Sequence, residues 1–220
     1  MDTVLRWLKL IFLGPEKPPR LEEERFPLDA RGRPDLARFT RSVDHYAGYI
    51  EDYLAALDSR GNSRNPAQPH TSEWQAWSYR KGVFGQWGLI ARGPADALPV
   101  VLQLLRHPVA EGRQAGAGVL SAWPPGSGEF ESAALAAAER EEASPDTDIE
   151  TLGVLLDMLA RARSDAALPL MARVLRDPKS STGDLDWSAI EALEVFAGQR
   201  FTKEPEPKQA AEQWLQERGL

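Results

Sequence analysis

The chain has 220 residues and a net charge of −7, with 42% hydrophobic residues and no cysteine. Without cysteine it has no disulfides, thiol nucleophiles, zinc ribbons or iron–sulfur clusters. The composition is that of a soluble globular protein, and the longest apolar-rich stretch, of about ten residues, is too short to span a bilayer.

The N-terminal 34 residues are predicted to contain a helix and an extended strap. Residues 1–13 are predicted to form a short helix that docks on the rest of the chain, because Gly14 and Pro15 end the apolar run. Residues 16–34 contain four prolines and are predicted to be an irregular strap. We expect a cytoplasmic protein, since Asp2 stands where a secretory signal would be basic. Membrane contact through residues 2–13 is the alternative to docking.

Residues 35–92 are predicted to form a long, degenerate first helix pair. Apolar residues recur at steps of three and four over 35–59, a polar loop covers 60–71, and a second helix follows over 72–92. The second helix has an aromatic face, formed by Trp74, Trp77, Phe84 and Trp87. This cluster is interpreted either as core or as a surface that stacks on a ligand or docks a peptide.

From Gly93 onward the pattern predicts shorter helices and no sheet, so the fold class is all-α. The expected helices are 94–107, 110–123, 129–143, 146–163, 165–177, 184–197 and 205–218.

Two of these segments repeat. Residues 97–108 and 167–178 are identical at six of twelve positions, and residues 134–145 are a weaker copy between them. Each copy ends in a proline, which pushes the preceding residue out of the helical region. The second helices also align through three apolar triplets: Ala117, Leu120, Trp123; Gly153, Leu156, Leu159; and Ile190, Leu193, Phe196. Because a single helix pair cannot bury such a face, we expect the pairs to stack into a continuous core.

The repeats resemble the HEAT-repeat family, in particular the short bacterial units also found in phycobilisome lyases. The resemblance rests on these residues: Ala97-Leu98-Pro99, Leu104-Leu105-Arg106, Pro108, Arg113 and Ala115–Gly118. It implies a right-handed α-solenoid of about four helix pairs and says almost nothing about activity. Ile149 and Asp186 replace the family's arginine at the position of Arg113, so we expect no stacked polar ladder.

The resulting domain prediction has an N-terminal part, 1–34, and a helical repeat domain, 35–220. Within that domain, 35–92 is the first pair, 93–198 the repeats and 199–220 a C-terminal cap. The cap is needed because the last pair would otherwise expose apolar surface. We expect Trp214 and Leu215 to point inward, and Glu212, Gln213 and Glu217 to point largely outward.

No catalytic, metal or cofactor site is predicted. The three histidines, His45, His70 and His107, lie far apart in the sequence. The chain has no phosphate-binding glycine loop, nucleophile elbow or zinc-binding helix motif.

The candidate site is a protein-binding surface. Residues 93–220 carry a net charge of −9, against +2 for residues 1–92. An acidic surface favours a basic protein partner and disfavours nucleic acid. The predicted second helices place acidic residues and a tryptophan on one face. We expect this face to line a concave groove that binds a basic helix or tail. The predicted site residues are Glu150, Asp157, Asp186, Trp187, Glu191 and Glu194. A solvated face that only aids solubility is the alternative.

Several functions remain open at this point. The preferred one is a non-enzymatic adaptor or scaffold, and an immunity-type protein that neutralises a toxin is a special case. The resemblance also allows a HEAT-like enzyme, either a bilin lyase or an alkylpurine DNA glycosylase, for which Asp186 and Trp187 are the nearest counterparts of the family's groove residues. A membrane-associated scaffold is the last alternative.

Overall fold

The computed structural model describes residues 48–50, 82–83, 85–124, 128–177 and 184–220. Every regular element among these residues is helical, which confirms the all-α class for the described part of the chain. The chain divides into two compact units, Met1–Pro94 and Ala95–Leu220. None of the described helices combines the length and apolar character that a membrane crossing requires.

Except for Gly93, which has a positive φ, the described residues of the first unit are helical. Ile50 and Leu89 are almost fully buried, and Trp87 is half-buried. A Cβ atom on Gly85 would lie 2.6 Å from the Ile50 side chain, so the backbone at Gly85 packs directly on that residue. The predicted segment 1–34, the histidines His45 and His70, and the aromatic residues Trp74, Trp77 and Phe84 lie outside the described residues.

The second unit contains seven α-helices and two short 3-10 helices among its described residues. In chain order they are α4 (Pro94–Leu104), α5 (Ala110–Ala122), α6 (Gly128–Glu142), α7 (Ile149–Arg161), η2 (Asp165–Ala167), α8 (Leu168–Arg176), α9 (Asp184–Ala197), η4 (Phe201–Lys203) and α10 (Pro207–Gln216). The predicted helix 184–197 has the observed bounds, 129–143 is displaced by one residue from α6, and the other predicted helices are too long at one or both ends.

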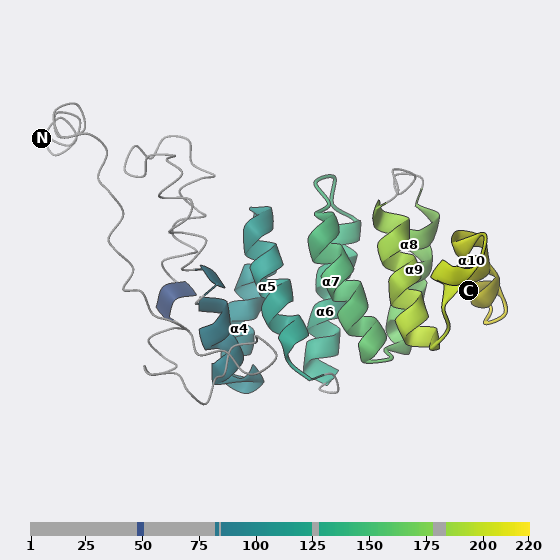
Figure 1. Cartoon of the computed structure of the whole chain (residues 1–220). Helices are drawn as coiled ribbons and strands as arrows, with labels where there is room; N and C mark the ends of the chain where they lie inside the picture. The colour runs from purple at the N-terminus through teal and green to yellow at the C-terminus, as the bar shows by residue number, and fades with distance from the viewer. Residues whose placement is uncertain (1–47, 51–81, 84, 125–127, 178–183) are drawn as a thin grey trace, which may run out of the picture. The chain divides into compact units, whose positions relative to one another are not determined.

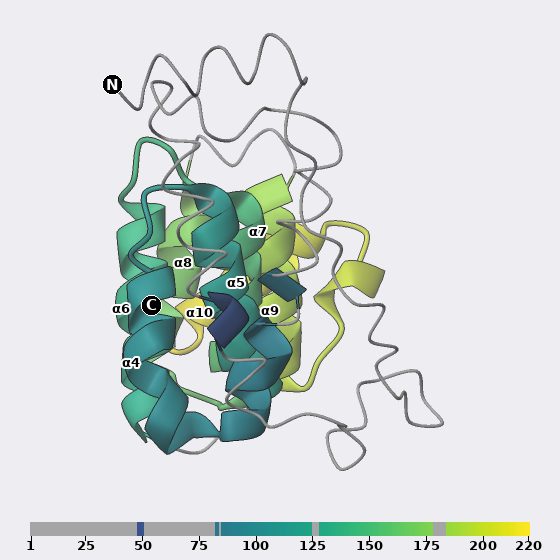
Figure 2. The same cartoon turned by 90° about the vertical axis from the view of Figure 1, so that its left-hand side faces the viewer.

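The helices of this unit form two layers (Figures 1 and 2). Helices α4, α6 and α8 lie on one side, and α5, α7 and α9 lie on the other. Helix α7 packs against α5, α6 and α9, and α8 packs against α9. Successive second helices are therefore neighbours in space, as the alignment of the apolar triplets predicts.

Local chemistry explains where the predicted helix ends are wrong. Helix α4 ends at Leu104, and the N–H of His107 donates to the Leu104 carbonyl at 2.9 Å, because Pro108 disfavours a helical His107. Helix α7 begins at Ile149, since the Asp148 side chain accepts a hydrogen bond from the N–H of Thr151 at 2.8 Å and caps the helix.

The predicted helix 165–177 is divided into two elements. Pro169 has no N–H, so the carbonyl of Asp165 cannot receive the usual helical bond from that position. The N–H of Leu168 donates to Asp165 instead, which closes the 3-10 turn η2. Helix α8 starts only at Leu168 and has the proline in its first turn.

The C-terminal helix α10 packs on α9 and α8. Trp214 and Leu215 are buried, as predicted, and Gln213 and Glu217 are exposed. The prediction for Glu212 is only partly correct, because its side chain is 22% exposed and pairs with an arginine of α8. The Trp214 ring makes edge contacts with Phe196 and Phe201, which close the end of the apolar core.

Helix α5 approaches the end of α4 closely because two of its residues have no side chain. A Cβ atom on Gly116 would lie 2.9 Å from the backbone nitrogen of Leu105, and one on Gly112 would lie 2.6 Å from the His107 ring. These contacts give the run of small residues in α5 a structural role: only glycine allows the two segments to lie this close.

This packing predicts different effects for two glycine-to-alanine changes. Gly116→Ala should lower the free energy of unfolding by about 1–3 kcal/mol, because its Cβ would overlap rigid backbone. Gly153→Ala should be close to neutral or stabilising, since its Cβ would meet the Ser188 Oγ at 3.2 Å, a side-chain atom that can move, and alanine favours helix. Urea unfolding of both variants measures the difference, and equal stability would contradict the packing of α5.

Candidate functional site

The outward faces of α7 and α9 carry most of the predicted site residues. On α9, Trp187, Glu191 and Val195 are exposed and lie four residues apart, so they share one side of the helix. On α7, Glu150 is exposed and Val154 is half-buried. Both helices belong to the same layer and pack on each other, so these residues lie on neighbouring helices (Figure 2).

The repeat register aligns positions across this layer. Gln114 of α5, Glu150 of α7 and Trp187 of α9 are equivalent positions of successive second helices. The Gln114 side-chain amide donates to the Glu150 carboxylate at 3.0 Å, so equivalent residues of neighbouring pairs touch.

Trp187 is held in an exposed position by its neighbour. The residue is 44% exposed, although tryptophan is highly buried on average. The indole Nε1 donates a hydrogen bond to the Glu191 carboxylate at 3.0 Å. The bond fixes one edge of the ring and places a carboxylate beside it, while part of the indole remains open to solvent.

Helices α7 and α9 lie close together beside this tryptophan. A Cβ atom on Gly153 would lie 3.2 Å from the Ser188 Oγ, so α7 presents bare backbone to α9 at this point. We define the Trp187 patch as the four residues at equivalent positions on either side of this contact: Glu150, Val154, Trp187 and Glu191. The patch combines an aromatic ring, an aliphatic side chain and two carboxylates.

Two other predicted site residues are engaged in ion pairs. Asp157 pairs with Arg161 of the same helix at 2.7 Å, and both side chains are about half exposed. Asp186 lies 3.5 Å from Lys208 of α10. The first pair leaves Asp157 on the surface but neutralised, whereas the second connects α9 to the C-terminal helix.

Glu194 does not belong to the exposed face that the sequence predicts for it. Its carboxylate accepts hydrogen bonds from the backbone N–H and the hydroxyl of Thr202, both at 2.6 Å, and the residue is half-buried. Glu194 therefore ties α9 to η4. The spacing within α9 could not show this, since the contact comes from the returning chain after Gly198.

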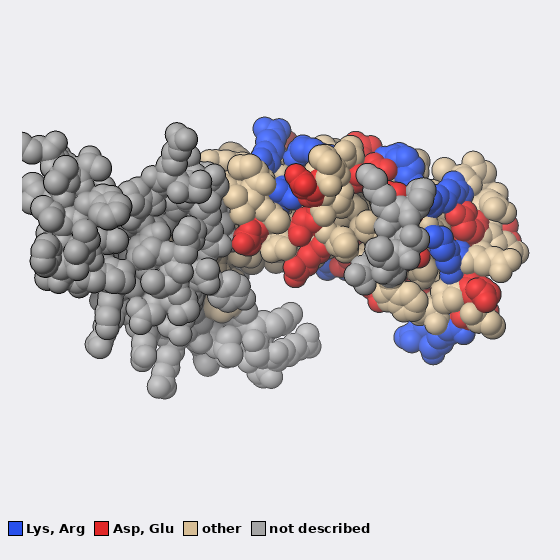
Figure 3. Space-filling view, turned by 90° about the horizontal axis from the view of Figure 1, so that it is seen from above, with Lys and Arg blue, Asp and Glu red and all other residues tan. Residues whose placement is uncertain are grey.

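The distribution of charged side chains does not by itself mark a binding surface on the face shown in Figure 3. Figure 3 shows acidic and basic side chains interleaved over the described helices on one face, with neither sign forming a continuous block. No patch of a single charge sign therefore stands out on this face.

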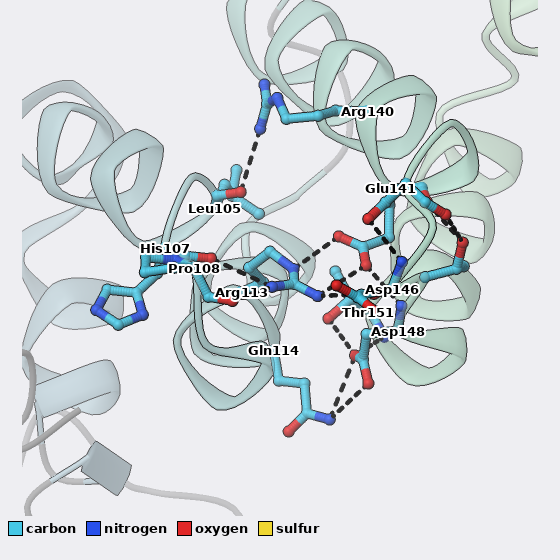
Figure 4. Close-up of polar contacts among 12 residues, drawn as sticks. Leu105, His107, Pro108, Arg113, Gln114, Arg140, Glu141, Asp146, Asp148 and Thr151 are labelled. Carbon is cyan, nitrogen blue, oxygen red and sulfur yellow. Dashed lines mark hydrogen bonds and ion pairs between the residues drawn. The ribbon is translucent and has the colours of Figure 1, made fainter. Parts of the chain in front are cut away.

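A buried polar network lies at the boundary between the first two pairs of this unit (Figure 4). The Arg113 guanidinium donates to both carboxylate oxygens of Glu141, at 2.8 and 3.0 Å. It also donates to the carbonyl oxygens of His107, Pro108 and Asp146. The side chains of Arg113 and Glu141 are only 13% and 5% exposed, so this is a largely desolvated ion pair.

The same network sets the start of α7. The Glu141 carboxylate accepts a hydrogen bond from the N–H of Asp148 at 2.6 Å. The Asp148 side chain caps α7 through Thr151 and also accepts from Gln114 at 3.3 Å. Arg113 thus orients the loop that precedes Glu150, which connects the buried network to the Trp187 patch.

Other arginines connect pairs in the opposite layer. Arg140 of α6 donates to the Leu105 carbonyl at 3.1 Å, and Arg173 of α8 lies 3.3 Å from Glu142. Arg176 of α8 pairs with Glu212 of α10 at 2.9 Å. The hydrogen bond to Glu212 raises the pKa of the Arg176 guanidinium.

His107 has a structural contact in the described chain. Its Nδ1 accepts a hydrogen bond from the N–H of Val109 at 3.1 Å at the start of α5, and the residue is 7% exposed. Within the described ranges, no three histidine, aspartate or glutamate side chains gather as metal ligands would.

Three residues that were not predicted from the sequence contribute to the surface. Val195 and Ile149 are exposed apolar residues, at 43% and 37%, and Gln114 contacts Glu150. The repeat register would have found Gln114, because it occupies the same position as Glu150 and Trp187. Helix spacing would have found Val195, because it follows Glu191 by four residues, although the equivalent Met158 is buried.

Comparisons with family models, curated proteins and solved structures gave no match.

The buried network predicts a large loss of stability when it is broken. Arg113→Leu should lower the free energy of unfolding by about 3–5 kcal/mol, because it leaves Glu141 charged, buried and without its main partner. Denaturant unfolding measures the loss.

Arg161→Ala is the matched control, since it removes an exposed pair and should cost less than about 0.5 kcal/mol. The double variant Arg113→Leu, Glu141→Leu should recover part of the stability. A small effect of Arg113→Leu alone would show that the network contributes little.

Proposed function

We propose that this chain is a HEAT-like α-solenoid that acts as a non-enzymatic, cytoplasmic adaptor, and that the Trp187 patch is where it binds a protein partner with a basic surface. The architectural part is supported by the packing of α7 against both α5 and α9. It is also supported by the contact between Gln114 and Glu150, which occupy equivalent positions of successive pairs.

The observation that carries the binding proposal is the exposed Trp187 beside the Glu191 carboxylate. Tryptophan is enriched among the residues that dominate the energetics of protein interfaces. Its large apolar area is costly to expose to water, and a partner would recover that cost by covering it. Val195, on the same side of α9, is also exposed, at 43%.

The charges of the patch support a basic partner. Glu150 is exposed and accepts a hydrogen bond from the neutral Gln114 amide, and Glu191 accepts one from the neutral Trp187 indole. Both carboxylates therefore keep their charge uncompensated within these pairs. A toxin-neutralising immunity protein would be one instance of such a binder. No contact among the described residues supports a bilin lyase or an alkylpurine DNA glycosylase, and we propose neither.

Affinity capture with the full chain as bait tests this function. A partner should be recovered with the parent chain and lost with Trp187→Ala and with the double variant Glu150→Lys, Glu191→Lys. Glu194 is left unchanged, since a substitution there would disturb the contact with Thr202. Glu139→Lys, an exposed change on α6 in the other layer, is the matched control and should retain the partner.

The captured protein should then be purified and its affinity measured directly. We expect each patch variant to weaken binding by about tenfold or more, with an unchanged thermal midpoint for unfolding. Equal capture by the parent and all patch variants would show that this surface is not the binding site.

A further inference from the structure

The exposed side chains of α9 form one line along the helix. Among residues 185–197, the exposed ones are Trp187, Glu191 and Val195, and they follow each other at steps of four. Residues four apart in a helix lie on one face, separated by about 6 Å along its axis. We call these three residues the α9 stripe. It consists of an aromatic, an acidic and an aliphatic side chain in that order.

Neighbouring elements contact α9 on both sides of this stripe. Ser188 and Glu194 are each three residues from Glu191, one on either side of it around the helix. Ser188 faces α7, since a Cβ atom on Gly153 would lie 3.2 Å from its Oγ. Glu194 accepts hydrogen bonds from Thr202 of η4. The stripe therefore runs between these two contacts and forms a ridge one residue wide.

A ridge of this kind suits a helix as its occupant. Side chains four residues apart form the ridges of a helix surface, and the commonest helix packing in globular proteins inserts such ridges into the grooves of a second helix. A flat surface would touch only the crest of so narrow a ridge and would forfeit the contacts along its sides. The α9 stripe therefore favours a helical partner element.

The charge in the middle of the stripe disfavours the simplest helical occupant, which is a second copy of α9. A two-fold contact brings the same surface of both copies together. Glu191 lies midway between Trp187 and Val195, so a two-fold pairing centred on the stripe would place it opposite its own copy, and like charges repel. The complementary helix has a cation at this position and an apolar side chain on either side.

The Glu191 carboxylate is already positioned for such a cation. It accepts a hydrogen bond from Trp187 Nε1 at 3.0 Å, so the two side chains hold each other in place along the stripe. The indole is a neutral donor and does not compensate the negative charge. Because this contact orders both side chains in the free protein, less side-chain entropy is lost when a partner binds.

Resting on the proposed function, we infer that the partner contributes an amphipathic helix that packs along the α9 stripe, with a basic residue at Glu191 between two apolar residues that cover Trp187 and Val195. The contacting residues of the partner recur every three or four positions, because they line one face of a helix. Val195 thereby becomes part of the binding site, although it lies outside the Trp187 patch.

Defined peptides test the inference with the full chain. The probe is a labelled alanine–glutamine peptide of about 20 residues, since shorter helices are marginal in water. It carries leucine, arginine and leucine four residues apart, and fluorescence anisotropy measures its affinity. One comparison peptide replaces the arginine by glutamate. The other places the same three residues at every second position, where they share the face of a strand and not of a helix. Each should bind at least about tenfold more weakly than the probe.

Protein variants locate the peptide on α9. Val195→Lys should weaken the probe by about tenfold or more, because it replaces an apolar contact by a cation that repels the arginine. Lysine is favourable in the last turn of a helix, so this variant should fold. Trp187→Ala should have a similar effect. Ala136→Lys, an exposed change on α6 in the other layer, is the matched control and should leave binding unchanged. Circular dichroism and the thermal midpoint confirm that each variant folds.

Four outcomes would overturn the inference. These are equal binding of the probe and the strand-patterned peptide, equal binding of the probe and the glutamate peptide, unchanged binding in Val195→Lys, and no binding of any peptide. Sedimentation at the assay concentration adds a fifth, because a dimer that Val195→Lys abolishes would identify a second copy as the occupant.

The inference and the proposed function can fail separately. If Trp187→Ala loses the captured partner but Val195→Lys retains it and no helical peptide binds, the surface recognises a partner of different shape and only the inference falls. If Trp187→Ala alters neither capture nor peptide binding, both fall.

Discussion

The packing of each helix pair against the next is the constraint on which this structure depends. Helix α7 buries apolar side chains toward several neighbours at once: Leu152, Leu155, Leu156, Met158 and Leu159. It contacts α6 of its own pair and α5 and α9 of the adjacent pairs. A pair with apolar residues on more than one side cannot shield them alone, so its folded form requires the next pair. The same packing aligns Gln114, Glu150 and Trp187 across three helices.

The buried ion pair at Arg113 shows how such an interface tolerates charge. Removing a guanidinium and a carboxylate from water is costly unless each finds several partners. Arg113 satisfies this condition by donating to Glu141 and to three backbone carbonyl oxygens. Those carbonyls belong to the turns after α4 and α6, which have no helical donors of their own. The pair therefore completes two helix ends and holds the loop before α7 in one conformation.

The sequence predicted the helices better than it predicted the role of their polar residues. Apolar periodicity located α9 and the inward side of α10, because burial acts on a face that spacing alone defines. The roles of Asp186 and Glu194 depended on Lys208 and Thr202, which approach only after the chain has turned back. The spacing of residues within α9 does not show which later residues will pack against it. Trp187 and Glu191 were placed correctly on one face since their contact lies within a single helix.

The arginine contacts of the α4, α6 and α8 layer each join only adjacent segments. Arg140 reaches the Leu105 carbonyl, Arg173 reaches Glu142, and Arg176 reaches Glu212. An opening at one boundary would leave the other contacts intact, so we expect the unit to fray from its edge inward rather than to open all at once. Amide hydrogens should accordingly exchange more slowly in α7, which has neighbours on both sides, than in α10 at the C-terminal edge of the described chain.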